Sequence, residues 1–453
     1  MKVSAIEINN FLNFESDFKL DLTYPVGHHT KAGKPLDKIC IIGQSGTGKT
    51  VLLNLIKFFS ADKISDKQLD FRKINDNVNI KFKIDTVADG TEISKKFVEG
   101  VFQYTSNGLL ENEIKERWTT YQTALTRILI HYPYDLIRKR EGQSELNSES
   151  NESKKKEEEI YLSDKVIDFE IRNIRENWRI MQELIEEHCI KENNLIRTKV
   201  EDMKKRPEDA IEKVSEIKNW ENENANPLAE CAEKYLNPIL NEFQLEVVQD
   251  IDLHELGNRD FIKIKQIKGD EIPFDLLSTG TKHTLLFALS LFLLKPQNTI
   301  ILFDEPERSL HPEMQVKFIE KILEMAPDCQ FIFASHSPTI ASIFEPWEVV
   351  HLEYNSDNGK TKRHFYYEEE NKVDNYTIFP EYLKYENILR KVFGVEYQAN
   401  YDVRAEALTD FARLKSELEV LKTKGRMKSP EYISLNSDFM KLAKRLGWEI
   451  SNN

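Results

Sequence analysis

The segment at residues 39–51 constrains the fold of this chain more than any other stretch. It reads ICIIGQSGTGKTV, in which Gly43, Gly48, Lys49 and Thr50 fit the pattern G-x-x-x-x-G-K-[ST]. Four apolar residues before the first glycine predict a short buried strand, and the apolar residues after the threonine predict a helix. A glycine-rich turn in this context can point its backbone N–H groups at phosphate oxygens, and the dipole of the following helix favours the same anion. The segment therefore predicts a nucleoside triphosphate site.

Each residue type in this loop has an expected role. Lys49 is placed to reach the β- and γ-phosphates of ATP, and the Thr50 hydroxyl is a predicted ligand of Mg²⁺. An ordinary glycine turn is the alternative, but the complete pattern between a strand and a helix favours phosphate binding. The residues expected to contact the nucleotide here are Gly43, Gln44, Ser45, Gly46, Thr47, Gly48, Lys49, Thr50 and Val51.

A second apolar strand, expected at residues 299–305, ends in two carboxylates, Asp304 and Glu305. A continuous apolar run is typical of a strand buried on both faces of a parallel sheet, and such sheets bind ligands at the carboxyl ends of their strands. Asp304 is therefore a predicted Mg²⁺ ligand. Glu305 is predicted to orient and deprotonate the attacking water.

Two further motifs lie near these acids in the sequence. The run LSTGTK at residues 277–282 opens an apolar helix, so Ser278, Gly280 and Lys282 are candidates for an anion site, with a simple helix cap as the alternative. The run FASHSP at residues 333–338 includes the end of an apolar strand and contains His336. A histidine at a strand end can hydrogen-bond a γ-phosphate, although a lone one is more often structural.

Composition limits the remaining possibilities. A chain of 453 residues has room for two or three domains, and a net charge of −14 argues against a surface covered in positive charge for nucleic acid. The four cysteines are far apart and include no C-x-x-C pair, so neither a zinc site nor a disulfide framework is expected. No secretory signal is recognised, and the apolar run at residues 285–294 is too short for a membrane span. We expect a cytoplasmic protein with no membrane partner.

The texture of the sequence divides the chain into four parts. We expect a β-rich half-domain at 1–105, a helical insertion at 106–244 with a mobile polar loop at 144–159, a second half-domain at 245–370 and a helical extension at 371–453. A heptad-like stripe from Ile167 to Ile185 predicts one long helix at 164–206, ended by Pro207 and paired with residues 207–243. A packed helical lobe and a protruding arm are both consistent with this pattern.

Alternating and continuous apolar patterns predict the other elements. Strands are expected at residues 6–8, 18–22, 78–84, 96–104, 245–251, 261–267, 347–352 and 363–367, and helices at 382–393, 403–424 and 431–446.

The order of the motifs, phosphate loop, LSTGTK, IILFDEPE, SLHP and FASHSP, resembles the ABC-type ATPase head shared by RecF, SMC and OLD proteins. The resemblance covers about residues 1–105 and 245–350. It implies an α/β P-loop NTPase head with a helical, short coiled-coil-like insertion and a helical C-terminal extension. Carried over from the family, the Walker A pair is Lys49 and Thr50, the Walker B pair is Asp304 and Glu305, the signature contains Ser278 and Gly280, the D-loop spans residues 309–312, and His336 is the switch histidine. The implied catalytic residues are Glu305, His336 and Lys49.

The family resemblance also implies partners. In this family ATP is bound between the phosphate loop of one head and the signature of another, which implies at least a homodimer and leaves a higher homo-oligomer open. Gln103 and Gln122 are candidates for the Q-loop residue. No zinc hook and no Toprim nuclease pattern is found, so the chain looks like the compact ATPase subunits of anti-phage systems such as PARIS, Septu and certain retrons.

Three functions follow from this resemblance. The first is a defence ATPase that controls a separately encoded nuclease or toxin, and the second is a RecF- or SMC-like ATPase that binds DNA in repair or recombination. The third, the ATPase of a membrane transporter, is disfavoured by the helical insertion and by the sequence SLHP. A DNA partner is permitted by basic runs such as Arg138–Arg140, which a solvated surface also explains.

Overall fold

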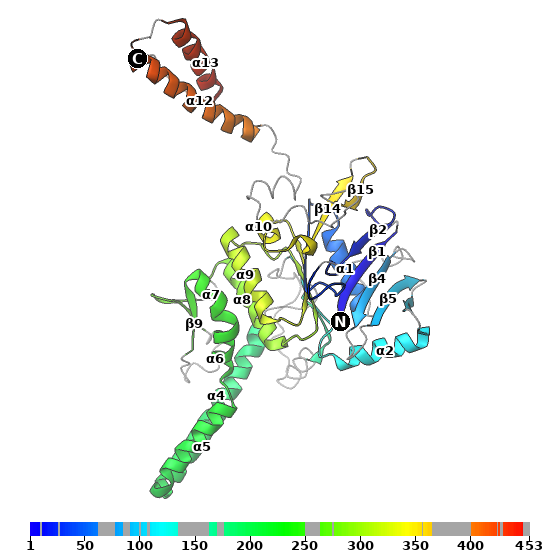
Figure 1. The fold of residues 1–453 in the computed structure, drawn as a ribbon. Coiled ribbons are helices and arrows are strands. Elements are labelled where there is room, and N and C mark those ends of the chain that lie inside the picture. Colours follow the sequence, from blue (N-terminus) through cyan, green and yellow to red (C-terminus); the bar gives the residue numbers. More distant parts are fainter. Residues whose placement is uncertain are drawn as a thin grey trace, which may run out of the picture. The chain divides into compact units, whose positions relative to one another are not determined.

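The computed structural model describes residues 1–9, 11–25, 28–61, 78–84, 91–98, 101–106, 109–134, 163–169, 176–249, 263–273, 276–355, 357–364, 400–423, 425 and 429–446. The chain forms two units, Met1–Ile388 and Leu389–Asn453. Of the residues that the structure describes, those in the first unit form three sheets with the helices that cover them, and those in the second form two helices (Figure 1).

A seven-stranded sheet forms the centre of the first unit. All its neighbouring strands are parallel except the antiparallel edge strand β15. The strand that precedes the phosphate loop, β3, and the strand that ends in Asp304, β12, flank β13 on either side. Every residue of β12 and β13 is buried, which explains their continuous apolar sequences. The strands, in spatial order, are β15 (Lys360–Arg363), β14 (Val349–Asn355), β3 (Lys38–Gly43), β13 (Gln330–Ser335), β12 (Ile300–Asp304), β7 (Leu129–Tyr132) and β8 (Val166–Asp168).

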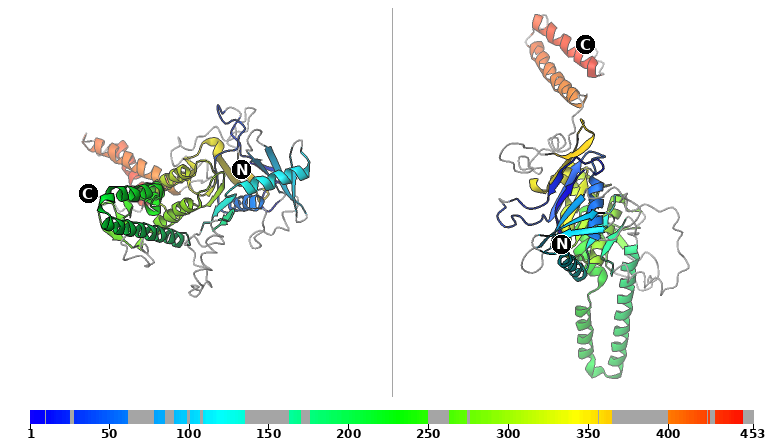
Figure 2. Two further views of the ribbon diagram at one scale, coloured as in Figure 1. Left: turned by 90° about the horizontal axis from the view of Figure 1, so that it is seen from below. Right: turned by 90° about the vertical axis from the view of Figure 1, so that its right-hand side faces the viewer.

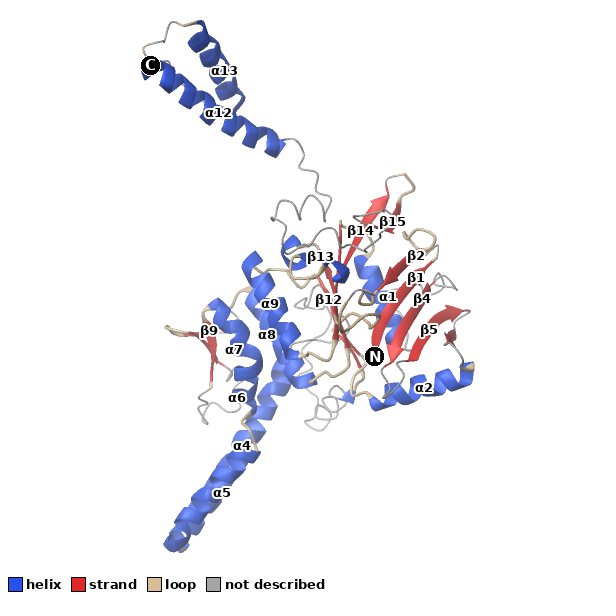
Figure 3. Cartoon of the chain, in the orientation of Figure 1, coloured by secondary structure: helices blue, strands red, loops and turns tan. Residues whose placement is uncertain are grey.

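Helices cover both faces of this sheet. The helix after the phosphate loop, α1 (Lys49–Ala61), lies on one side of β12 and β13, and α8 (Thr279–Leu294) and α9 (Pro312–Met325) lie on the other (Figure 3). On the second face the ring of Phe287 lies 5.1 Å from that of Phe303 and 5.5 Å from that of Phe318, centroid to centroid. Most of α8 is buried, in accord with its nearly uniform apolar sequence.

An antiparallel five-stranded sheet packs against the outer side of α1. Phe58 of α1 lies 5.1 Å from Phe97 and 5.0 Å from Phe102, again between ring centroids. A helix of this layer, α2 (Glu111–Ala124), buries Ile114 and Trp118. The strands, in spatial order, are β2 (Phe18–Asp21), β1 (Lys2–Ile8), β4 (Val78–Ile84), β5 (Thr91–Val98) and β6 (Val101–Thr105).

The insertion contains a helical hairpin. Its first helix, α4 (Glu176–Lys205), contacts α8 and buries side chains up to Cys189. Beyond that residue neither α4 nor α5 (Ala210–Glu223) has a buried side chain, and the two helices contact each other, for instance through stacked rings of His188 and Trp220. The far half of the hairpin therefore extends from the head as an arm, as the right-hand view in Figure 2 shows.

The chain returns to the head through short elements. They are α6 (Pro227–Cys231), a π-helical turn (Ala232–Leu236), α7 (Asn237–Leu240) and a three-stranded antiparallel sheet of β9 (Leu245–Val248), β10 (Lys263–Gln266) and β11 (Glu271–Ile272). A short helix, α10 (Pro338–Ala341), follows β13.

The described part of the second unit forms a pair of helices. Helices α12 (Asn400–Thr423) and α13 (Pro430–Leu446) contact each other, and the rings of Phe411 and Phe439 stack with their centroids 4.4 Å apart. Both helices were predicted at these places. The helix predicted at 382–393, the mobile loop predicted at 144–159 and the domain boundary predicted near residue 371 lie outside the described residues.

Three predicted elements are wrong in detail. The predicted helix at 164–206 starts too early, because Val166–Asp168 form strand β8, which pairs with β7, and α4 begins only at Glu176. The strand predicted at 96–104 is two strands, β5 and β6, paired antiparallel. The strand predicted at 363–367 ends instead at Arg363. In each case strand pairing, which local periodicity does not encode, decided the boundary: β8 pairs with β7, and β5–β6 and β14–β15 are hairpins.

Candidate functional site

The predicted phosphate loop and the predicted acidic strand end meet at one edge of the central sheet. In the parallel register Asp304 lies beside Ala334, and Ser335 lies beside Ile42, the residue before Gly43. The carboxyl ends of β12, β13 and β3 are therefore adjacent, which is where a parallel sheet presents ligand-binding loops. In the sequence, this shared edge was indicated by polar residues that directly follow three separate apolar strands.

The phosphate loop has the backbone that its glycines allow. Gly43, Gly46 and Gly48 have φ of 151°, 85° and 89°, values that residues with a Cβ rarely adopt. A Cβ on Gly43 would lie 2.4 Å from the Leu352 carbonyl oxygen, whereas one on Gly46 would meet nothing within 4 Å. Gly43 is thus required by close packing, and Gly46 faces the open side of the loop, together with the exposed Gln44 and Ser45.

Lys49 is folded over its own loop. Its Nζ donates hydrogen bonds to the carbonyl oxygens of Gly43 at 2.8 Å and Gln44 at 3.0 Å. Burial lowers the pKa of Lys49 to about 8, and the charge of Asp304 opposes this shift. Both of these hydrogen bonds go to neutral carbonyl oxygens, which bind a cation more weakly than an anionic phosphate does.

Thr50, the first-turn residue of α1, contacts the acidic strand end. Its Oγ1 donates a hydrogen bond to Asp304 Oδ2 at 2.8 Å. Burial raises the pKa of Asp304, and the hydrogen bond from Thr50 opposes the rise. A hydroxyl and a carboxylate are the oxygen ligands that Mg²⁺ prefers, so these two side chains fit the predicted cation.

Glu305 and His336 complete a chain of contacts that ends at Lys49. The distance from His336 Nε2 to Glu305 Oε1 is 3.4 Å, and His336 Nδ1 lies 3.4 Å from Lys49 Nζ. Burial and the Lys49 charge both lower the pKa of His336. Glu305 has the positive φ of 51°, and its backbone N–H donates to the Ala334 carbonyl, so the residue turns out of the strand while its side chain stays partly exposed. His336 therefore links the other two predicted catalytic residues, Lys49 and Glu305.

Of the predicted signature residues, Gly280 packs on the D-loop and Ser278 caps α8. Ser278 caps α8 by accepting a hydrogen bond from the Thr281 N–H at 3.1 Å, so the alternative of a helix cap is realised. Gly280 packs so closely on the D-loop that a Cβ there would lie 2.3 Å from the Ser309 carbonyl oxygen. Ser278 is exposed and Lys282 is partly buried. The exposed cap leaves the amino end of α8 open to an anion from outside this chain.

Two residues of the site escaped the sequence-based prediction. Glu307 Oε1 accepts hydrogen bonds from Ser335 Oγ at 2.8 Å and from the backbone N–H of His336 at 2.7 Å. Gln315 of α9 donates to the Leu310 carbonyl of the D-loop at 3.0 Å and accepts from Ser337 Oγ at 2.5 Å. Glu307 follows the Walker B pair and could have been suspected from that position, whereas nothing in the sequence marked Gln315.

The two Q-loop candidates lie elsewhere. Gln103 is on β6, at the edge of the five-stranded sheet, where it pairs with Lys96. Gln122 donates a hydrogen bond to the carbonyl of Ser60, near the end of α1. Since Ser60 lies about three turns, or roughly 16 Å, along α1 from Lys49, Gln122 is far from the phosphate loop.

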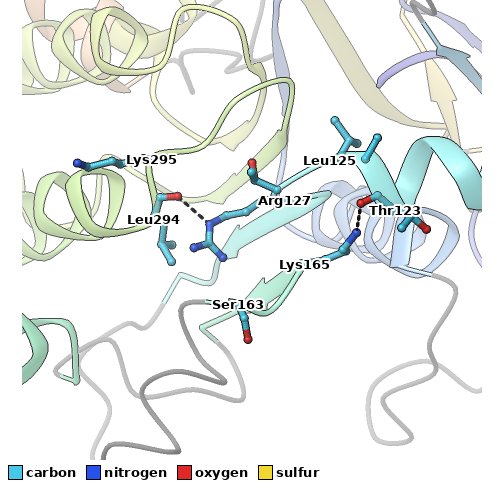
Figure 4. A pocket seen from close by; sticks show the side chains of 9 residues that line it. Thr123, Leu125, Arg127, Ser163, Lys165, Leu294 and Lys295 are labelled. Carbon is cyan, nitrogen blue, oxygen red and sulfur yellow. Dashed lines mark hydrogen bonds between the residues drawn. The ribbon is translucent and has the colours of Figure 1, made fainter.

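A hollow of about 480 Å³ lies at the opposite edge of the sheet (Figure 4). Two of its basic side chains are engaged with helix ends: Arg127 Nε donates to the Leu294 carbonyl of α8 at 2.8 Å, and Lys165 Nζ donates to the Thr123 carbonyl of α2 at 2.8 Å. Cations at helix C-termini stabilise the unpaired carbonyls there. The hollow is therefore explained by helix capping and is separate from the nucleotide edge.

Among the described residues, no group of three or more histidine, cysteine or acidic side chains is arranged to hold a metal ion, and all four cysteines are free and buried. The helices that the structure describes also include none with the length and apolar character needed to cross a membrane.

Comparison with known proteins agrees with this geometry. The family profile described as "AAA ATPase domain" matches residues 1–341. The retron Vc95 probable ATPase of Vibrio cholerae serotype O1 biovar El Tor is 31% identical over 114 residues, a stretch that spans 22% of this chain and 22% of that protein. The predicted resemblance to retron ATPases and the predicted α/β P-loop fold are thus confirmed.

Solved SMC heads align with a large part of the chain. The SMC head domain from Thermotoga maritima has a TM-score of 0.42 at 14% identity and covers 80% of this chain and 98% of its own. An SMC head bound to the C-winged helix domain of ScpA has a TM-score of 0.42 at 13% identity and covers 80% of this chain and 97% of its own.

Proposed function

Because the chain belongs to the AAA ATPase domain family, we propose that it binds ATP with Mg²⁺ at the phosphate loop and hydrolyses it to ADP and phosphate. The observation that carries this proposal is the contact between Thr50 and Asp304, with Lys49, His336 and Glu305 linked beside it. Groups for phosphate binding, cation binding and activation of water therefore share one edge of the sheet.

Each residue has a distinct task in this proposal. Lys49 exchanges its two carbonyl contacts for the β- and γ-phosphates, and Thr50 with Asp304 holds the cation. Bound Mg²⁺ would neutralise charge that develops on the phosphates. Glu305, which is partly exposed, orients and deprotonates the attacking water. His336 contacts both Glu305 and Lys49, so it is placed to respond to the presence of the γ-phosphate.

We place the second half of the ATP site on another copy of the chain. Ser278 is exposed at the amino end of the 16-residue helix α8, and Leu276 just before it is 75% exposed. An exposed helix N-terminus with a serine cap suits a phosphate, and an apolar side chain beside it suits a protein contact. Two heads would then enclose ATP between Lys49 of one and Ser278, Gly280 and Lys282 of the other. A higher homo-oligomer built from such dimers is compatible with this arrangement.

The biological role that we propose is the sensor or scaffold subunit of a bacterial anti-phage system in the cytoplasm. ATP-dependent closure of the heads would hold or release a separately encoded nuclease or toxin. The similarity to the retron Vc95 probable ATPase supports this role over a RecF- or SMC-like function on DNA, and the net charge of −14 points the same way.

The test is the native mass of the Glu305→Gln protein, with and without ATP and Mg²⁺, after co-expression with its genomic neighbours. A large assembly that forms with ATP and retains a neighbour-encoded protein supports the scaffold role. A chain that dimerises with ATP and retains nothing but binds duplex DNA with strong salt dependence would replace it with the DNA-binding function. Failure to bind ATP at all would overturn both.

A further inference from the structure

A buried polar cluster lies on the α1 side of the central sheet. Asp168 of β8 accepts a hydrogen bond from Lys57 Nζ of α1 at 2.9 Å, and its other carboxylate oxygen lies 2.8 Å from His131 Nδ1 of β7. Lys57, His131 and Asp168 are 9%, 2% and 7% exposed. Burial alone would raise the pKa of Asp168, but the hydrogen bond from His131 and the Lys57 charge hold this pKa well below its usual range. In a neutral imidazole whose Nδ1 donates to a carboxylate, Nε2 is an acceptor.

Two buried atoms beside this cluster have no hydrogen-bond partner. They are His131 Nε2 and Asn54 Oδ1. An unsatisfied buried polar atom costs about 1–3 kcal/mol, and such atoms in folded proteins usually bind an ordered water. Each of the two orphan acceptors therefore points to a bound donor.

Helix α1 and the central sheet place Asn54 and His131 next to the Thr50–Asp304 pair, which is the proposed cation-binding edge. Thr50, Asn54 and Lys57 follow one another at spacings of four and three residues, which puts them on one face of α1. Thr50 binds Asp304 near the N-terminus of α1, and Lys57 binds Asp168 about two turns further along, so Asn54 lies between them.

The strand register gives the same position for His131. His131 pairs with Leu302, and Asp304 lies two residues further along β12 on the same face of the sheet. The two nitrogens of an imidazole point in nearly opposite directions. Since Nδ1 faces Asp168 on β8, Nε2 faces the other neighbour of β7, which is β12.

We propose that His131 is a positioning residue for the cation-binding edge, with Lys57 and Asp168 fixing its ring. In this arrangement His131 Nε2 and Asn54 Oδ1 each accept one hydrogen of a water molecule beneath the Thr50–Asp304 pair. The oxygen of that water is then directed at the hydration shell of Mg²⁺, which keeps several waters in proteins. Groups of this kind, one shell out from a metal, typically change metal affinity by about 10- to 100-fold when removed. This inference rests on the proposed binding of ATP with Mg²⁺.

The experiment uses the full chain with Glu305→Gln, which separates binding from hydrolysis. The dissociation constant of a fluorescent ATP analogue is measured once in Mg²⁺ and once in excess EDTA. The readout is the Mg²⁺-dependent ratio, which is the dissociation constant in EDTA divided by that in Mg²⁺. His131→Asn keeps a polar group near the Nδ1 position alone, whereas His131→Gln keeps one near the Nε2 position. We expect His131→Asn to lower the Mg²⁺-dependent ratio about tenfold with little change in EDTA, and His131→Gln to restore most of it.

A structural role for the cluster predicts a different pattern. If His131→Asn keeps the ratio while His131→Gln lowers thermal stability, the cluster merely fastens β8 to α1 and the proposal is overturned. His351→Asn is the matched control, because His351 is also buried in a strand of this sheet but lies on β14. Should His131→Asn fail to fold, Asn54→Leu removes the other acceptor and is expected to lower the ratio several-fold; an unchanged ratio overturns the proposal.

Failure of the proposed function would give a different result from failure of this inference. A Glu305→Gln protein that gains no affinity for the nucleotide from Mg²⁺ removes the premise, before any His131 variant is compared. If the Glu305→Gln parent has a large Mg²⁺-dependent ratio and all the variants keep that ratio, this inference alone is overturned.

Discussion

The hydroxyl of Thr50 donates a 2.8 Å hydrogen bond to the carboxylate of Asp304, although the two residues are 254 positions apart in the chain. One stands at the start of α1 and the other at the end of β12, so the contact exists only because the sheet places β3 one strand away from β12. This contact joins the phosphate-binding half of the sequence to the half that carries the acids. The following predictions depend on the edge of the sheet that it defines.

Glu305→Gln should abolish hydrolysis while sparing nucleotide binding. The amide keeps the shape of the side chain and its place beside His336 but cannot take a proton from water, so we expect a rate reduction of about 10²- to 10⁴-fold. Single-turnover hydrolysis and filter binding of ATP measure the two properties separately. Hydrolysis at the wild-type rate would remove Glu305 from the catalytic assignment.

ATP affinity should fall as the pH rises above about 8. The pKa of Lys49 is about 8 in the nucleotide-free protein, and the anionic phosphates bind the protonated lysine better. Above this pKa binding must take up a proton, so the dissociation constant should rise by up to tenfold per pH unit. Isothermal titration between pH 7 and pH 9.5 in buffers of different ionisation enthalpy reports both the affinity and the proton uptake.

Lys49→Arg is the control for this pH dependence. Guanidinium stays protonated throughout the range, so any affinity that this variant retains should lose the inflection near pH 8. An inflection of equal size in the variant would assign the titration to another group.

Substitution of two loop glycines should separate close packing from backbone conformation. Gly46→Ala meets open space and costs only the strain of a positive φ, about 1–2 kcal/mol. Gly43→Ala also drives its methyl group into the Leu352 carbonyl and should cost about 3 kcal/mol or more. Thermal unfolding without nucleotide compares the two variants. Equal losses of stability would mean that β14 moves away from the loop without cost.

Glu348→Gln should change how stability depends on pH. Burial raises the pKa of Glu348 to about 7, with the Lys38 charge opposing the shift, so between pH 4.5 and pH 7 the folded state holds a proton that the unfolded state has lost. The contribution of Glu348 to stability therefore falls as the pH rises through this window, by about 3 kcal/mol in total. The free energy of unfolding of the glutamine variant minus that of wild type should therefore be larger at pH 8 than at pH 4.5. Denaturant unfolding of both proteins at both pH values measures this difference.

The outcome at pH 8 is the sensitive one. Glu348 is only 3% exposed and its nearest cation, Lys38 Nζ, is 3.3 Å away, so ionisation in the folded state carries a desolvation cost that one ion pair offsets in part. A variant that is less stable than wild type at pH 8 by the same amount as at pH 4.5 would show that the ion pair fully compensates that cost.

The sequence by itself determined the parts of this site that are local. The phosphate loop needs glycines at fixed spacing because a Cβ would collide or strain the backbone, and the strands that end at Gly43, Asp304 and Ser335 needed continuous apolar runs because both faces of their sheet are buried. Such requirements apply to residues that are consecutive in the chain, so they can be recognised from the sequence alone.

Only the tertiary structure decided what lies between these segments. Val166–Asp168 reads as the start of a long helix, yet it completes the sheet as β8, because pairing with β7 and the buried contact of Asp168 with Lys57 and His131 outweigh helical periodicity. Gln315 gained its place between the D-loop and Ser337 in the same way. Contacts between residues far apart in the chain are set by how the layers pack, and packing is a property of the whole fold that no local pattern carries.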